Sequence, residues 1–173
     1  MPNRGTLSEF QSYLANRLAA SSERGVASLL GVLSGSEYWL LDLSDSGEVV
    51  ALPELTGVPL TQPWFLGLAN IRGNLYSVID FSVFQGQEAT PHNASARLLL
   101  IGTNHGSNAA LLVNRIVGLR NIDDLSPAPQ QDYGTPPDWA QQAYTDREGR
   151  YWKQLKVEAL LADERFMDIG IPS

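Results

Sequence analysis

The chain contains no cysteine among its 173 residues. This absence excludes a disulfide framework, a zinc site with thiolate ligands and a cysteine nucleophile. Basic residues are also scarce, because 12 Lys and Arg stand against 19 Asp and Glu, for a formal net charge of −7. A chain this acidic is not expected to have nucleic acid or an anionic membrane surface as its main partner.

Long hydrophobic runs are missing as well. No apolar run approaches the length of about 18 residues that a membrane-spanning helix requires. The first ten residues lack the hydrophobic region of a signal peptide. The hydrophobic fraction of 43% is nevertheless ordinary for a globular protein. We therefore expect a soluble, cytoplasmic, single-domain protein without direct membrane insertion.

Motifs that carry catalysis or bind cofactors are absent from the sequence. The two histidines, His92 and His105, lie in polar, loop-like surroundings without metal-ligand spacing. There is no GxSxG nucleophile elbow and no glycine-rich phosphate loop. Asp42 and Asp80 interrupt apolar segments, where carboxylates that accept backbone hydrogen bonds are commoner than catalytic acids. The sequence predicts no enzyme, no metal site and no cofactor. A hydrolase is the alternative, and it would need a histidine beside a nucleophile.

The first segment has the pattern of an amphipathic helix. Leu7, Phe10, Leu14 and Leu18 recur at spacings of three, four and four, which places them on one helix face. We therefore predict an N-terminal amphipathic helix with its lead-in over residues 1–25.

The pattern changes after residue 25 to short apolar runs bounded by Gly, Ser, Asn or Asp. The predicted strands are 28–34, 37–43, 48–52, 65–71, 75–81, 97–102, 109–113, 116–120 and 150–156. Gly35-Ser36 and Gly73-Asn74 are expected to supply the positive-φ residues of two tight hairpins.

The end of the chain combines a proline-rich stretch with a short helix. Residues 121–142 contain four prolines among polar side chains. Too little chain follows for a separate domain, so this stretch is predicted to wrap the surface and return a last strand and a helix over 157–162. Many short strands without alternating helices predict an antiparallel all-β barrel or sandwich.

Arg72 is isolated in the charge pattern. Between residues 25 and 96 it is the only basic side chain, against seven acidic ones, and it lies at the tip of a predicted hairpin. An ion pair with a nearby carboxylate would pin the hairpin, whereas an outward guanidinium would form part of a docking edge for another protein. These two interpretations are compatible.

Four segments in this order resemble a known family. They are Glu48-Val49, Val58-Pro59, WFLGLANIRGNLYSVIDF at 64–81 and ALLVNRIVGL at 110–119. Together they resemble the CheW-like family of chemotaxis coupling proteins over residues 28 to 165. Within this family the sequence is most similar to the adaptors of type IV pilus twitching-motility systems. Ser77 and Asn114 depart from the family pattern, which usually has Pro and Asp there.

The resemblance implies a fold, partners and a location. The implied fold is all-β, with two small intertwined five-stranded β-barrel subdomains over residues 26–168 and a C-terminal tail at 169–173. The implied role is a non-catalytic adaptor that binds the regulatory domain of a CheA-like histidine kinase and the cytoplasmic tip of a methyl-accepting chemoreceptor. Such a protein would be cytoplasmic and recruited to membrane chemoreceptor arrays, with the cell poles as one location.

The resemblance also implies a set of partner-binding or hairpin-pinning residues. Two match the family's ion-paired positions, Glu48 and Arg72. Five match positions on or beside the receptor-binding groove: Gly67, Asn70, Gly73, Ile116 and Leu119. The alternatives are a CheW coupling protein of the flagellar type and a β-barrel that binds a small ligand in its interior.

Overall fold

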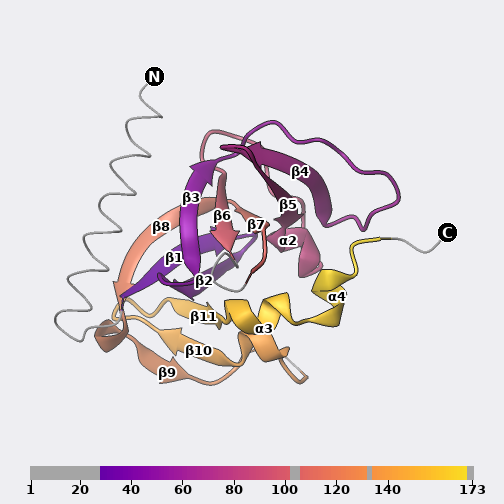
Figure 1. The fold of residues 1–173 in the computed structure, drawn as a ribbon. Helices are drawn as coiled ribbons and strands as arrows, with labels where there is room; N and C mark the ends of the chain where they lie inside the picture. The colour runs from indigo at the N-terminus through magenta and orange to yellow at the C-terminus, as the bar shows by residue number, and fades with distance from the viewer. Residues whose placement is uncertain (1–27, 102–105, 132–133, 171–173) are drawn as a thin grey trace.

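The structure is a computed structural model that describes residues 28–101, 106–131 and 134–170. The predicted N-terminal helix within residues 1–25 lies outside the described residues, as does His105. The described chain forms two β-sheets that are connected and flanked by short helices (Figure 1).

The first sheet, sheet A, has six strands in the order β8-β1-β2-β11-β10-β9. Its strands are β1 (Ser28–Ser34), β2 (Glu37–Asp42), β8 (Arg115–Asn121), β9 (Ser126–Ala128), β10 (Gln142–Thr145) and β11 (Tyr151–Leu155). All neighbours are antiparallel except β11 and β2, which are parallel. The chain leaves sheet A after β2 and returns to it at β8, so the two sheets are intertwined.

The second sheet, sheet B, has five strands in the order β3-β6-β7-β5-β4. Its strands are β3 (Ser46–Ala51), β4 (Phe65–Ile71), β5 (Asn74–Asp80), β6 (Arg97–Ile101) and β7 (Ala109–Val113). Here β5 and β7 are the parallel pair. The prediction of a wholly antiparallel arrangement is therefore wrong at one pair in each sheet.

Short helices connect and cover the strands. They are α2 (Phe81–Phe84), the 3-10 helices η2 (Ile122–Asp124) and η3 (Asp138–Ala140), α3 (Val157–Leu161) and α4 (Glu164–Met167). The predicted helix over 157–162 is confirmed as α3. In Figure 1, α2 and α4 lie to the right and α3 in the lower centre, with β3 and β8 on the left.

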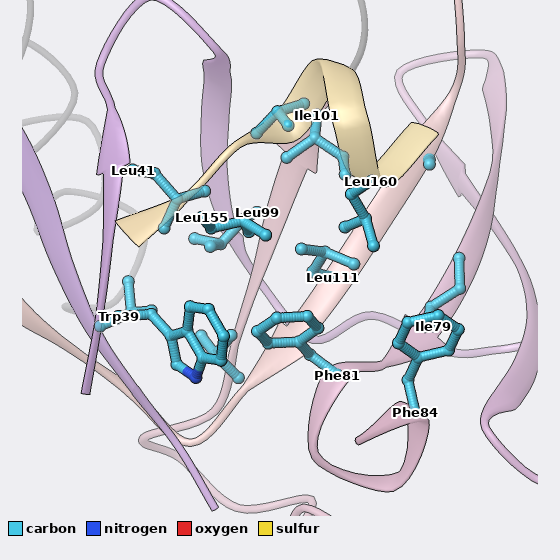
Figure 2. Packing of buried hydrophobic residues seen from close by; sticks show 14 of the residues in the cluster. Trp39, Leu41, Ile79, Phe81, Phe84, Leu99, Ile101, Leu111, Leu155 and Leu160 are labelled. Carbon is cyan, nitrogen blue, oxygen red and sulfur yellow. The ribbon is translucent and has the colours of Figure 1, made fainter. Parts of the chain in front are cut away.

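A shared core lies between the two sheets. Trp39 and Leu41 of β2 pack there with Leu99 of β6, Leu111 of β7 and Leu160 of α3 (Figure 2). Adjacent residues on β6 and β7 point to opposite faces, so Leu98 and Leu112 join a second core that sheet B forms alone. A third core in sheet A centres on Trp152 and Leu40. Both faces of β6 and β7 are buried, which explains their uninterrupted apolar sequences.

The prediction of two closed five-stranded barrels is corrected by the strand order. Sheet A has six strands, and in the described residues both sheets are open, with β8 and β9 as the edges of sheet A and β3 and β4 as those of sheet B. After β3, the segment containing Pro53, Pro59 and Pro63 pairs with β4 at an isolated bridge between Thr56 and Leu68. Proline lacks the N–H group that a ladder needs, so this segment cannot extend β3 along β4.

The stretch 121–142 contains more regular structure than predicted. It holds η2, β9 and η3 and leads into β10, so it forms an edge of sheet A. Pro127 lies on β9, where an edge strand tolerates proline.

Candidate partner-binding surface

The β4–β5 hairpin presents Arg72 at its tip. The turn consists of Arg72 and Gly73, with φ angles of 53° and 86°. Two positive φ angles define the type I′ geometry that suits two-residue hairpins. The side-chain Oδ1 of Asn70 accepts a hydrogen bond of 2.9 Å from the Gly73 N–H, which holds the turn closed. The positive-φ pair is therefore Arg72-Gly73, one residue earlier than the predicted Gly73-Asn74.

Arg72 forms an ion pair with Glu48 of β3. β3 and β4 are opposite edges of sheet B, so this pair joins the edge hairpin to the far edge of the sheet. The Arg72 side chain is 65% exposed, whereas that of Glu48 is 20% exposed. The guanidinium is thus held by a carboxylate and also presented to solvent. The sequence indicated an ion pair and an outward guanidinium as compatible interpretations for Arg72, and the two occur together.

Gly67 lies where the segment after β3 crosses β4. Its φ is 132°, and a Cβ built on it would lie 2.3 Å from the carbonyl oxygen of Thr56. Thr56 and Leu68 exchange two backbone hydrogen bonds at this crossing. Because residue 67 is a glycine, the segment that follows β3 can approach β4 closely enough to pair with it.

Ile116 and Leu119 belong to the other sheet. Both lie on β8, the edge strand of sheet A, and both are partly buried against the shared core. The structure therefore brings Glu48, Asn70, Arg72 and Gly73 together at one end of sheet B and places the two apolar residues on a separate edge.

The two departures from the family pattern have local structural roles. The Oδ1 of Asn114 accepts a 2.8 Å hydrogen bond from the Gly35 N–H and so ties the β1–β2 turn to the start of β8. An amide oxygen performs this task without the charge of an aspartate. The Ser77 N–H donates to the carbonyl of Asn108 at 3.0 Å, a bond that proline could not make. Sequence reasoning did not find the Asn114 contact, because its partner is 79 residues away.

The residues considered for catalysis have ordinary surroundings. The buried carboxylate of Asp80 caps α2 and accepts hydrogen bonds from Ser82 and from both the N–H and the hydroxyl of Thr90. Asp42 is exposed and accepts from Ser44. His92 is exposed in the loop before β6. Within the described ranges, no group of three or more His, Asp or Glu side chains is arranged to hold a metal ion.

No helix in the described part of the chain is long and apolar enough to cross a membrane.

Comparison with known proteins identifies the family to which this chain belongs. The model of the CheW-like domain matches residues 28–165, and the chain belongs to this family. The structure is similar to the crystal structure of the scaffolding protein TtCheW from Thermoanaerobacter tengcongensis, with a TM-score of 0.65 and 20% identity. That match covers 76% of this chain and 85% of TtCheW.

Two named proteins with similar sequences show which members of the family this chain resembles. The chain is 25% identical to Protein PilI of Pseudomonas aeruginosa over 146 residues, which cover 82% of this chain and 79% of PilI. It is 27% identical to Chemotaxis protein CheW of Helicobacter pylori over 107 residues, which cover 61% of this chain and 64% of that protein. The predicted resemblance to CheW-like proteins, and to a pilus chemosensory adaptor among them, is confirmed.

Proposed function

We propose that this protein is a non-catalytic adaptor that couples a methyl-accepting chemoreceptor to a CheA-like histidine kinase in type IV pilus signalling. The observation that carries the proposal is the ion pair between Glu48 and Arg72, formed at an exposed hairpin in a chain of the CheW-like family. The pilus context is supported by the similarity to PilI. The protein would act in the cytoplasm, at receptor arrays.

The receptor tip would bind along the edge of sheet A that carries Ile116 and Leu119. These apolar side chains are partly buried and remain accessible on edge strand β8. An amphipathic helix could lay its apolar face against them. Gly67, Asn70 and Gly73 would contribute by fixing the β4–β5 hairpin in place, with Arg72 and Glu48 at or behind the docking surface.

A pull-down with purified partners tests the proposal. The kinase and the receptor signalling domain from the same cell are mixed with this protein, with its Arg72→Ala variant and with Arg147→Ala. Arg147 serves as a control, because it is also largely exposed and forms an ion pair with Asp124, away from the β4–β5 hairpin. A ternary complex that weakens only with Arg72→Ala supports the proposal, whereas no association of well-folded protein with either partner contradicts it.

A flagellar-type coupling protein would use the same fold, and the similarity to the Helicobacter pylori CheW favours it as the second candidate. Pull-downs with flagellar and pilus kinases in parallel distinguish the two. A ligand-binding barrel is disfavoured by packing, because fully buried side chains such as Val78, Leu98 and Leu112 occupy the face of sheet B where a ligand cavity would have to lie.

A further inference from the structure

A polar groove runs along the side of the molecule that carries α2, η3 and α4. Its main hollow has a volume of about 580 Å³, and its lining includes Glu37 of β2, Lys153 of β11, Arg165 of α4 and the loop residue Gln130. A second hollow of about 260 Å³ shares Ser36, Glu37 and Lys153 with the first. The two hollows therefore adjoin at the Glu37–Lys153 ion pair. The seven residues of the proposed partner-binding surface line neither hollow.

The charge of the groove is opposite to that of the chain. Arg165, Lys153 and Arg150 line it, and Glu37 is its one acidic residue among the described lining residues. The groove thus carries a formal charge of +2 (three cations and one anion) in a protein of net charge −7. Arg150 lies over the ring of Tyr38 and Arg165 over that of Phe84, each 4.3 Å from the ring centre. These stacked guanidinium groups are held in fixed positions suited to binding carboxylates.

Two residues that line the main hollow each carry a buried side-chain polar atom without a partner, which favours an amide-bearing ligand. The indole Nε1 of Trp39 and the side-chain Oε1 of Gln130 have no hydrogen-bond partner among the described residues. Both residues line the hollow, and Trp39 is 1% exposed. One atom is a donor and the other an acceptor, and a peptide group offers one acceptor and one donor. Buried polar groups without a partner are costly, so a ligand that pairs with them gains affinity.

One part of the lining, around Gln130 and η3, is tied together by side-chain hydrogen bonds. The Gln130 Nε2 donates to the carbonyl oxygens of Ala140 and Gln141, and the Gln141 Nε2 donates to those of Pro136 and Pro137. These bonds fix the amide orientation of Gln130 and leave its Oε1 as the acceptor. A preformed wall reduces the entropy lost when a ligand binds.

We propose that this groove binds an extended acidic peptide segment of a partner protein. Its main-chain amides would pair with Trp39 and Gln130, while its carboxylates would face Arg165 and Arg150. The volume of the main hollow lies within the range of about 300–1,000 Å³ that is usual for ligand sites. The site is independent of the receptor–kinase surface proposed above.

The test is an NMR titration of the ¹⁵N-labelled protein with a capped octapeptide that alternates glycine and glutamate. The matched control peptide has glutamine in place of glutamate. We expect a Kd below about 1 mM for the acidic peptide, at least tenfold weaker binding of the control, and a shift of the Trp39 indole N–H signal. The indole signal of Trp64, which does not line the groove, should stay in place.

Single-residue variants inside and outside the groove test where the acidic peptide binds. Arg165→Gln and Arg150→Gln should each weaken binding of the acidic peptide by about tenfold, which corresponds to one lost charge-assisted contact. Arg147→Gln removes an exposed cation outside the groove and should leave binding unchanged. The proposal is overturned if the acidic peptide does not bind at about 10 mM, if both peptides bind equally, or if Arg147→Gln weakens binding as much as Arg165→Gln. The titration contains neither kinase nor receptor, so its failure leaves the proposed function untouched.

Discussion

Arg72, in the turn between β4 and β5, forms an ion pair with Glu48 on β3, the strand at the opposite edge of sheet B. Together with the Thr56–Leu68 bridge, this pair joins two edges that the backbone ladder leaves open. The same guanidinium is largely exposed, so its structural task leaves it available to a partner. Its contribution to stability and its proposed contribution to binding can therefore be measured separately.

The first prediction concerns the stability that the ion pair provides. Because Arg72 is mostly exposed, Arg72→Ala should lower the free energy of unfolding by only about 0.5–1 kcal/mol. A double-mutant cycle with Glu48→Gln, followed by urea unfolding, should give a coupling energy of about 0.2–1 kcal/mol that falls with added salt. A coupling energy of zero would show that the pair does not stabilise the sheet.

The second prediction concerns the crossing at Gly67. Gly67→Ala places a methyl group against the Thr56 carbonyl and forces a side chain into the positive-φ region. Its unfolding free energy should fall by more than about 2 kcal/mol. Gly73→Ala, which meets no atom within 4 Å but also has a positive φ, should cost about 1–2 kcal/mol. Gly57→Ala has neither feature and should be neutral to within about 1 kcal/mol. Equal effects at all three positions would contradict the steric explanation.

The third prediction concerns pH. Burial acts to raise the pKa of Asp146, but hydrogen bonds from the Trp152 indole and from the backbone N–H groups of Arg150 and Glu148 outweigh it and lower that pKa below its ordinary value of 3.8. The unfolded chain therefore takes up the proton first as pH falls. The stability that the Asp146 carboxylate provides is complete above the unfolded-state pKa and is lost as pH falls through the lower folded-state value.

Unfolding of the protein and of Asp146→Asn by urea between neutral and strongly acidic pH measures this effect. The difference in unfolding free energy between the two proteins should be largest at neutral pH and should shrink under acid. A difference that grows with acidity would reverse the sign of the assigned pKa shift.

The fourth prediction concerns the shared core. Leu111 is fully buried between the two sheets, so Leu111→Ala should cost about 2–5 kcal/mol. Because both sheets pack on this core, amide hydrogen exchange in β2 and in β6 should accelerate together. Acceleration confined to sheet B would show that the sheets unfold as separate units.

The sequence predicted most of the strands, because each is a run of apolar residues ended by a turn residue. β1, β4 and β7 have the predicted bounds, 28–34, 65–71 and 109–113. β9 and β10 were not predicted, since a three-residue strand with a proline and a four-residue polar strand carry little periodic signal. The four-residue helices α2 and α4 are too short to show a helical period, and each is preceded by an N-capping aspartate, Asp80 or Asp163.

The candidate site was only partly predictable. The scarcity of basic residues around Arg72 indicated that it needed a partner, but the choice of Glu48 came from the family resemblance, because the two residues are 24 positions apart. The groove beside α4 was not predicted at all. Its cations come from β11, from the turn before β11 and from α4, and only folding brings these segments beside the β1–β2 turn.

The most direct test of the central claim is the autophosphorylation rate of the CheA-like kinase, measured with and without the receptor signalling domain. We predict that the receptor changes this rate only when the adaptor is present, that Arg72→Ala reduces the change and that Arg147→Ala preserves it. A rate that is indifferent to the receptor in the presence of folded protein, with pilus and flagellar kinases alike, would contradict a coupling role.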